Sequence, residues 1–70
     1  MTLKTAEEGR EYTVLDIETN DDALNSFLFS LGCYIGEKVA VVSNTKHGCT
    51  ISIKDSRYSI DNQLANAIIV

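Results

Sequence analysis

The chain has 70 residues, of which 44% are hydrophobic, and its ten acidic and six basic side chains give a formal net charge of −4. This length and composition indicate one small folded domain rather than a disordered chain. The acidic balance argues against binding to nucleic acid or to an anionic membrane surface, because both require a dense cationic patch. No apolar run approaches the roughly 18 residues of a membrane span, and no signal peptide is recognisable, so we expect a cytoplasmic protein.

The first 18 residues are predicted to contain one strand. Residues 1–9 are expected to form a short polar lead-in that ends at Gly9. Residues 10–18 alternate between apolar and polar side chains, but the phase of the alternation changes between Val14 and Leu15. A phase change of this kind predicts a strand with a bulge.

A helix is predicted to follow. Asn20 or Asp21 can cap its first free N–H groups, and Gly32 can end it in a left-handed conformation. Between them, the apolar residues recur at the spacing that forms one stripe on a helix, and they are Leu24, Phe27, Leu28 and Leu31.

The second half of the chain is predicted to be rich in strands. Strands are expected over residues 38–43, 49–54, 57–60 and 67–70, with a hairpin loop over 44–48 and a helical turn over 61–66 that Asp61 caps. With the first strand, this makes five short strands and one or two short helices. Closure into a barrel leaves few unpaired strand edges. The predicted fold is therefore mainly β with one or two short helices, a small five-stranded SH3-like barrel.

The sequence contains no constellation of residues that points to an enzyme. It has one histidine, no glycine-rich phosphate loop and no G-x-S-x-G motif. The acidic pairs are consecutive residues, so their carboxylates need not converge on one substrate atom. Asp21 and Asp22 are explained by the positive end of a helix dipole. We therefore expect no catalytic residues and no cofactor.

His47 and Cys49 form the only pair with the chemistry of a transition-metal site, and Cys33 is a conceivable third ligand. Structural zinc sites usually take four ligands in two close pairs, which the chain lacks. The favoured interpretation makes His47 a solvated hairpin residue and Cys49 a core residue in phase with Ile51. Two cysteines make no disulfide framework, so both are expected to be free thiols.

Phe29 is an apolar residue on the polar side of the predicted helix. It lies opposite the apolar stripe, among polar residues, and Tyr34 and Ile35 follow just beyond the helix end. These three side chains are predicted to form an exposed patch that binds a protein partner. The alternative is that the hairpin loop or the N-terminal segment covers them, and the sequence leaves both open.

Laid end to end, these pieces resemble the FeoA family of small domains associated with bacterial ferrous iron uptake. The resemblance includes an opening Leu-Gly segment at Leu3 and Gly9, a Leu-Gly-x-x-x-Gly core over residues 31–36, and the closing apolar segment over residues 65–70. The chain departs from the family pattern at four positions, which are Phe27, Cys33, Ile35 and Asp61.

The resemblance implies an SH3-like barrel without catalytic activity. It further implies an accessory or regulatory protein that binds the cytoplasmic side of a FeoB-type membrane transporter. Two alternatives stay open: a metal-binding or metal-sensing domain that uses His47, Cys49 and Cys33, and a module that associates with its own copy through the apolar patch. We expect a monomer or weak self-association.

Overall fold

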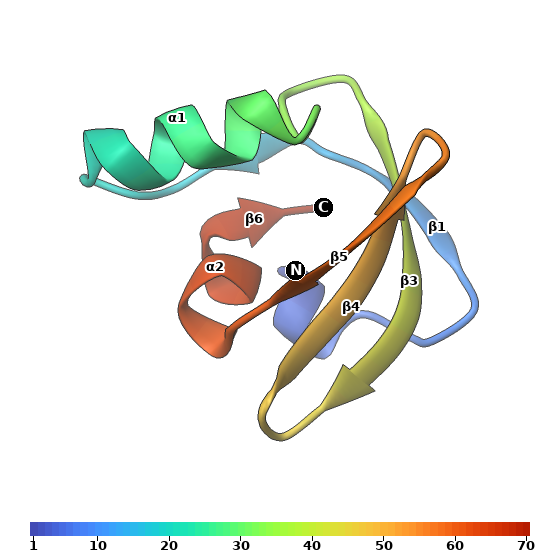
Figure 1. Ribbon diagram of the computed structural model, residues 1–70. Coiled ribbons are helices and arrows are strands. Elements are labelled where there is room, and N and C mark those ends of the chain that lie inside the picture. Colours follow the sequence, from blue (N-terminus) through green and yellow to red (C-terminus); the bar gives the residue numbers. More distant parts are fainter.

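The computed structural model describes residues 1–70 and contains two antiparallel sheets (Figure 1). The larger has the strand order β1-β3-β4-β5 and consists of β1 (Glu11–Thr13), β3 (Lys38–Thr45), β4 (Gly48–Ile53) and β5 (Ser56–Ile60). The smaller pairs β2 (Asp16–Ile17) with β6 (Ile68–Ile69). The expected mainly β class is confirmed, but the strands number six and the two sheets are not joined into one closed barrel.

The predicted bulge in the first strand is wrong, because the chain changes sheets at this point. Residues of β1 pair with β3, whereas residues of β2 pair with β6. Val14 between them is buried, and Leu15 is 60% exposed. From sequence alone, a transfer between sheets and a bulge produce the same phase change. The irregular register lies in β3, between Val41 and Ser43.

The N-terminal segment is part of the core rather than a polar lead-in. A short 3-10 helix, η1 (Leu3–Thr5), carries Leu3 into the interior, where Leu3 and Ala6 are buried. The side-chain amide of Asn44 donates hydrogen bonds to the carbonyl groups of Leu3, Lys4 and Ala6. These bonds attach the segment to β3, across about forty residues of sequence.

Helix α1 (Asp22–Ser30) begins and ends as predicted. Asp21 is the N-cap, and its carboxylate accepts hydrogen bonds from the backbone N–H groups of Ala23 and Leu24. Gly32 adopts a φ of +89°, which a residue with a side chain rarely does. The apolar stripe is only partly buried, since Leu28 is inaccessible but Phe27 is 47% exposed.

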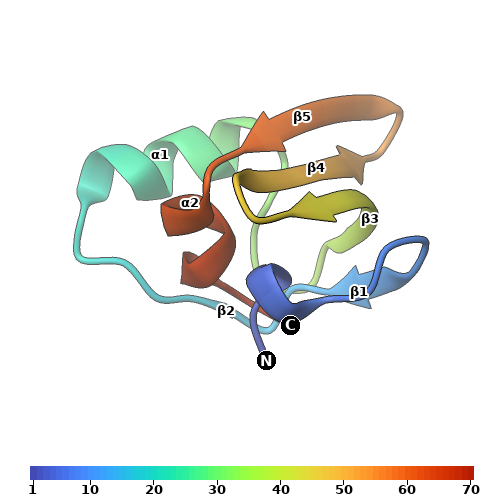
Figure 2. The ribbon, with the colours of Figure 1, turned by 90° about the horizontal axis from the view of Figure 1, so that it is seen from below.

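Helix α2 (Asn62–Ala67) completes the fold on the same side of the larger sheet as α1 (Figure 2). Asp61 caps it, because its carboxylate accepts a hydrogen bond from the N–H group of Leu64. The fifteen buried residues are all hydrophobic, so the interior contains no polar or charged side chain. No helix is long and apolar enough to cross a membrane.

Candidate functional site

The largest hollow on the surface is an apolar groove between β2, α1 and the connection that follows α1. We call it the α1 groove. It has a volume of about 670 Å³ and is lined by Asp16, Ile17, Asn25, Ser26, Phe29, Cys33, Tyr34 and Ile35. Its lining thus includes all three residues of the predicted contact patch.

Phe29, Tyr34 and Ile35 lie together on the surface and are not covered by other segments. Phe29 is 67% exposed and Ile35 is 64% exposed, while Tyr34 is half-buried. The rings of Phe29 and Tyr34 have centroids 5.1 Å apart. The alternative in which the hairpin loop or the N-terminal segment folds over these side chains is therefore wrong. Whether the patch binds a partner stays a prediction.

Backbone hydrogen bonds hold the connection after α1 in place. The N–H group of Cys33 donates to the carbonyl of Leu28, which ties the connection to the last turn of the helix. Further along, Gly36 donates to the carbonyl of Val14, and Val14 donates to that of Glu37. Tyr34 and Ile35 lie between these anchors, so the groove wall that they form is supported on both sides.

The remaining lining residues were not singled out from the sequence as partner contacts. Asp16 and Ile17 come from β2, and Asn25 and Ser26 come from the face of α1 that carries Phe29. The phase change after Val14 is the one sequence signal that bears on β2. It indicated an irregular strand, but it gave no indication that the strand borders α1.

Cys33 lines the groove, but its thiol is not suited to act as a nucleophile. The residue is only 2% exposed. Burial raises the pKa of its thiol from the ordinary 9.0 to about 11, because the thiolate loses its hydration. The reactive species of cysteine is the thiolate. At neutral pH Cys33 therefore carries a protonated thiol and serves as a small apolar side chain.

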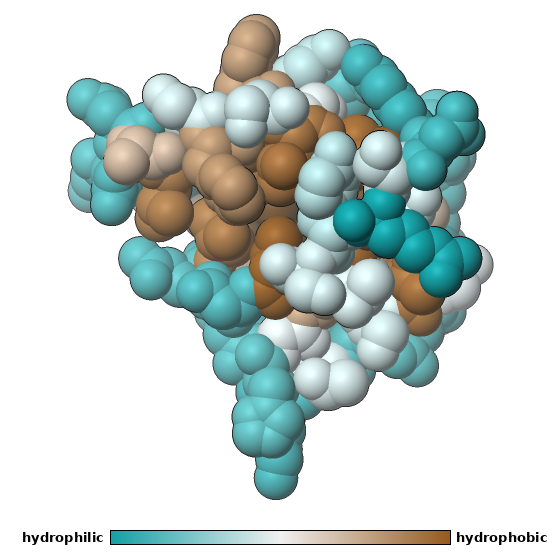
Figure 3. All heavy atoms as spheres, viewed as in Figure 1, coloured by the Kyte–Doolittle hydropathy of each residue, from teal (hydrophilic) through white to brown (hydrophobic).

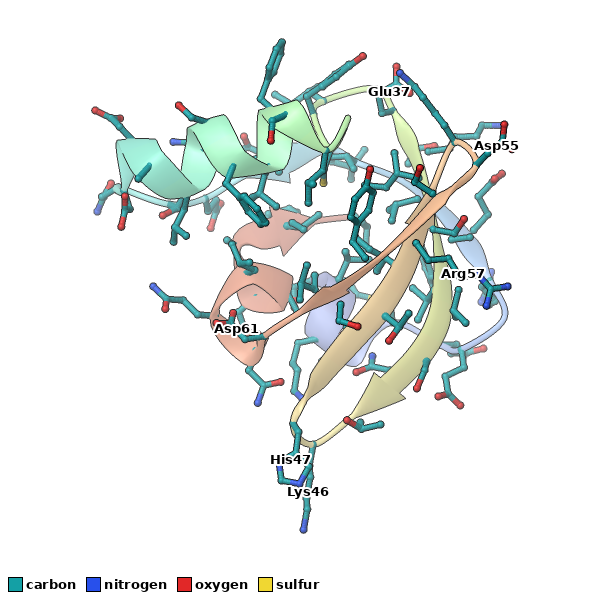
Figure 4. The ribbon with its side chains drawn as sticks, viewed as in Figure 1. Glu37, Lys46, His47, Asp55, Arg57 and Asp61 are labelled. Atoms are coloured by element: carbon teal, nitrogen blue, oxygen red, sulfur yellow. The ribbon has the colours of Figure 1, made fainter.

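The candidate metal ligands do not form a three-ligand site. His47 projects from the tip of the hairpin between β3 and β4 (Figure 4), whereas Cys49 is buried in β4. Both border a hollow of about 210 Å³, but Cys33 borders the α1 groove instead. No three His, Cys, Asp or Glu side chains are grouped closely enough to hold a metal ion. Burial also raises the pKa of the Cys49 thiol, which opposes the thiolate form that binds metals.

A second apolar region lies on the other side of α1. Figure 3 shows apolar side chains gathered below this helix, while hydrophilic ones cover the hairpin tip. Phe27, on the stripe of α1 that faces the core, is half-exposed, and Leu24 and Leu31 on the same stripe are also incompletely buried. This region is the nearest competitor of the α1 groove as a contact surface.

Comparison with known proteins gives a family match over the whole chain and several matches in fold. The chain matches the FeoA domain over residues 1–70. An iron uptake regulatory protein, FeoA, aligns at 23% identity with a TM-score of 0.88, covering 97% of this chain and 91% of that one. The FeoA protein of Stenotrophomonas maltophilia, complexed with zinc and described as a prokaryotic SH3 domain protein, aligns at 20% identity with a TM-score of 0.86, covering 99% and 87%.

The same fold occurs within a longer protein. A manganese-dependent transcriptional repressor aligns at 18% identity with a TM-score of 0.89, and the match covers 97% of this chain but only 39% of the repressor. No curated protein matches the chain by sequence. At these identities the structural matches establish the SH3-like fold of the chain.

Proposed function

Since the chain belongs to the FeoA family, whose members are non-enzymatic accessory proteins of ferrous iron transport, we propose that it binds the cytoplasmic portion of a FeoB-type transporter through the α1 groove. The observation that carries this proposal is the exposure of Phe29, 67% of which is accessible on the wall of a groove. A large aromatic side chain in this position leaves most of its apolar surface available to a partner.

The composition of the groove supports a protein partner. Its lining combines aromatic and aliphatic side chains with Asn25 and Ser26, an apolar surface edged by polar groups. Protein interfaces have the same arrangement, with an apolar centre and a polar rim. Aromatic side chains that enter such a centre supply much of the binding free energy. Phe29 and Tyr34 are therefore the residues expected to contribute most.

The test is a titration of the isotope-labelled protein with the purified cytoplasmic portion of the FeoB-type transporter from the same organism, followed by amide chemical shifts. We expect the shifts to concentrate in residues 25–36. The variant Phe29→Ser should bind at least about thirtyfold more weakly, since hot-spot aromatic residues contribute roughly 2 kcal/mol or more. The control Val42→Ser alters an exposed apolar residue outside the groove and should leave the affinity unchanged.

A third variant separates the two faces of α1. If Phe27→Ser weakens binding and Phe29→Ser does not, the partner occupies the opposite face and the assignment of the groove is wrong. If the folded wild-type protein shows no shifts at a large excess of the transporter portion, the proposed function itself is wrong.

A further inference from the structure

The α1 groove carries a single charged side chain, the carboxylate of Asp16. Its other lining residues are apolar, apart from Asn25 and Ser26, and none of them is basic. Lys54 lies beside the groove without lining it, with its ammonium group 5.9 Å from the ring centroid of Tyr34. A partner that enters the groove therefore meets an apolar surface whose one charged lining group is the carboxylate of Asp16.

Asp16 is held in a defined position without being neutralised. Its backbone pairs with Ile69 in the smaller sheet, and its Oδ1 atom accepts a hydrogen bond from the N–H group of Ile17 at 2.8 Å. The two ion pairs of the protein, Glu7–Arg10 and Glu11–Lys38, do not involve it. Its Oδ2 atom accepts no hydrogen bond, so the carboxylate retains the capacity to bind a cation.

We infer that the α1 groove is selective for a protein segment that places an apolar side chain against Phe29 and a neighbouring Lys or Arg side chain against Asp16. The inference rests on the proposed function and specifies the chemistry of the partner. An ammonium or guanidinium group bonded to a positioned carboxylate forms a charge-assisted hydrogen bond. An acidic segment or an anionic lipid headgroup would instead be repelled.

A charge at the rim of an interface acts mainly on selectivity and on the rate of association. Removal of an exposed pair should therefore have a modest effect on affinity and a clear effect on its salt dependence. In contrast, loss of Phe29 should weaken binding at every salt concentration, because apolar contacts are insensitive to ionic screening. The two contributions are separable by experiment.

The experiment measures the affinity for the transporter's cytoplasmic portion at about 0.05 M and about 0.5 M salt, where screening of exposed charges differs strongly. Asp16→Asn keeps an oxygen that can accept the Ile17 hydrogen bond and removes only the charge. We expect it to lower the affinity about two- to fivefold at low salt and to flatten the salt dependence. Asp16→Lys should weaken binding further. The control Asp55→Asn makes the same change in the turn between β4 and β5, outside the groove, and should behave as the wild type.

The outcomes distinguish this inference from the proposed function. If Phe29→Ser weakens binding while both Asp16 variants bind as the wild type, the basic partner residue is ruled out and the groove assignment survives. If the wild-type protein does not bind, the proposed function and the inference both fail. If groove resonances instead shift with the protein's own concentration in the absence of the transporter, a second copy occupies the groove and the inference is overturned.

Discussion

The ring of Phe29 packs against the ring of Tyr34, with centroids 5.1 Å apart and ring planes inclined by 34°. The pair joins α1 to the connection that follows it and forms one wall of the α1 groove. The ammonium group of Lys54 also lies 5.9 Å from the ring centroid of Tyr34. Tyr34 thus has two neighbours at its ring, whereas Phe29 remains largely exposed.

Replacement of Phe29 by serine should cost little stability. The side chain is 67% exposed, so its principal contribution is the contact with Tyr34, and aromatic pairs contribute about 0.5–1.5 kcal/mol. Chemical denaturation should therefore show a decrease of about 1 kcal/mol in the free energy of unfolding. The neighbouring variant Leu28→Ala removes a fully buried side chain and should lose about 2–5 kcal/mol. Equal losses in the two variants would show that Phe29 belongs to the core.

Asn44 should be a strong determinant of stability although it is polar. Its amide nitrogen lies 2.9–3.1 Å from the carbonyl oxygens of Leu3, Lys4 and Ala6. Asn44→Ala removes the amide donor from these carbonyl groups, of which that of Leu3 keeps the Ala6 N–H group as a donor, and it loosens the segment that carries Leu3 into the core. We expect a loss of about 1–3 kcal/mol in the free energy of unfolding.

Gln63→Ala provides the matched control for Asn44. Gln63 is an exposed amide on α2 for which the structure shows no side-chain hydrogen bond. Its replacement should change the free energy of unfolding by less than about 0.5 kcal/mol. Amide hydrogen exchange adds a local measurement, because protection of residues near η1 should fall in Asn44→Ala alone. Unchanged protection there would contradict the anchoring role.

His47 and Cys49 should not form a tight zinc site. Two ligands at most are available there, one of them a buried thiol with a raised pKa, whereas zinc sites in proteins use at least three protein ligands. In a titration with Zn²⁺, the His47 ring resonances should shift only at about millimolar concentrations. A one-to-one complex of micromolar affinity that disappears in His47→Ala would refute this prediction.

The stability of the protein should fall in alkaline solution through Cys33. The unfolded thiol loses its proton near pH 9, but the folded thiol keeps it until about pH 11. The folded state therefore binds more protons between these values, and the free energy of unfolding decreases as the pH rises from 9 to 11. Between pH 9 and pH 11, the titration of Cys33 should lower the free energy of unfolding by about 2 kcal/mol.

The variant Cys33→Ala isolates this contribution from the titration of tyrosine and lysine side chains. It should be less stable than the wild type at pH 8, because it leaves a small cavity in the core. Its stability should decline less steeply between pH 9 and pH 11. Parallel declines in the two proteins would show that the Cys33 thiol does not titrate in this range.

Features that depend on neighbouring residues were predictable from the sequence. The cap at Asp21, the stop at Gly32 and the cap at Asp61 all follow from hydrogen bonds between residues at most four positions apart. The strand over residues 49–54 was recognised by alternation, and the one over 38–43 by its run of β-forming apolar residues. The exposure of Phe29 was predictable because this residue breaks the apolar pattern of its helix.

Features that depend on distant segments were not predictable in this way. The burial of Leu3 requires Asn44, and the separation of β1 from β2 requires β6, which ends the chain. The partial exposure of Phe27 has the same origin. Spacing places it on the stripe that faces the core, but the extent of its burial depends on what the rest of the chain packs against it.

The sequence by itself determined the small mainly β domain, the N-caps of both helices, the end of α1 and the apolar residue out of place on α1, because short-range hydrogen bonding and side-chain periodicity specify them. Only the tertiary structure decided that this residue lines a groove with Asp16 and Cys33, and that His47, Cys49 and Cys33 do not converge. The groove brings together β2, α1 and the connection after it, and the alignment of separate elements is determined by packing of the common core. A pattern in one segment contains no information on which other segment will lie beside it.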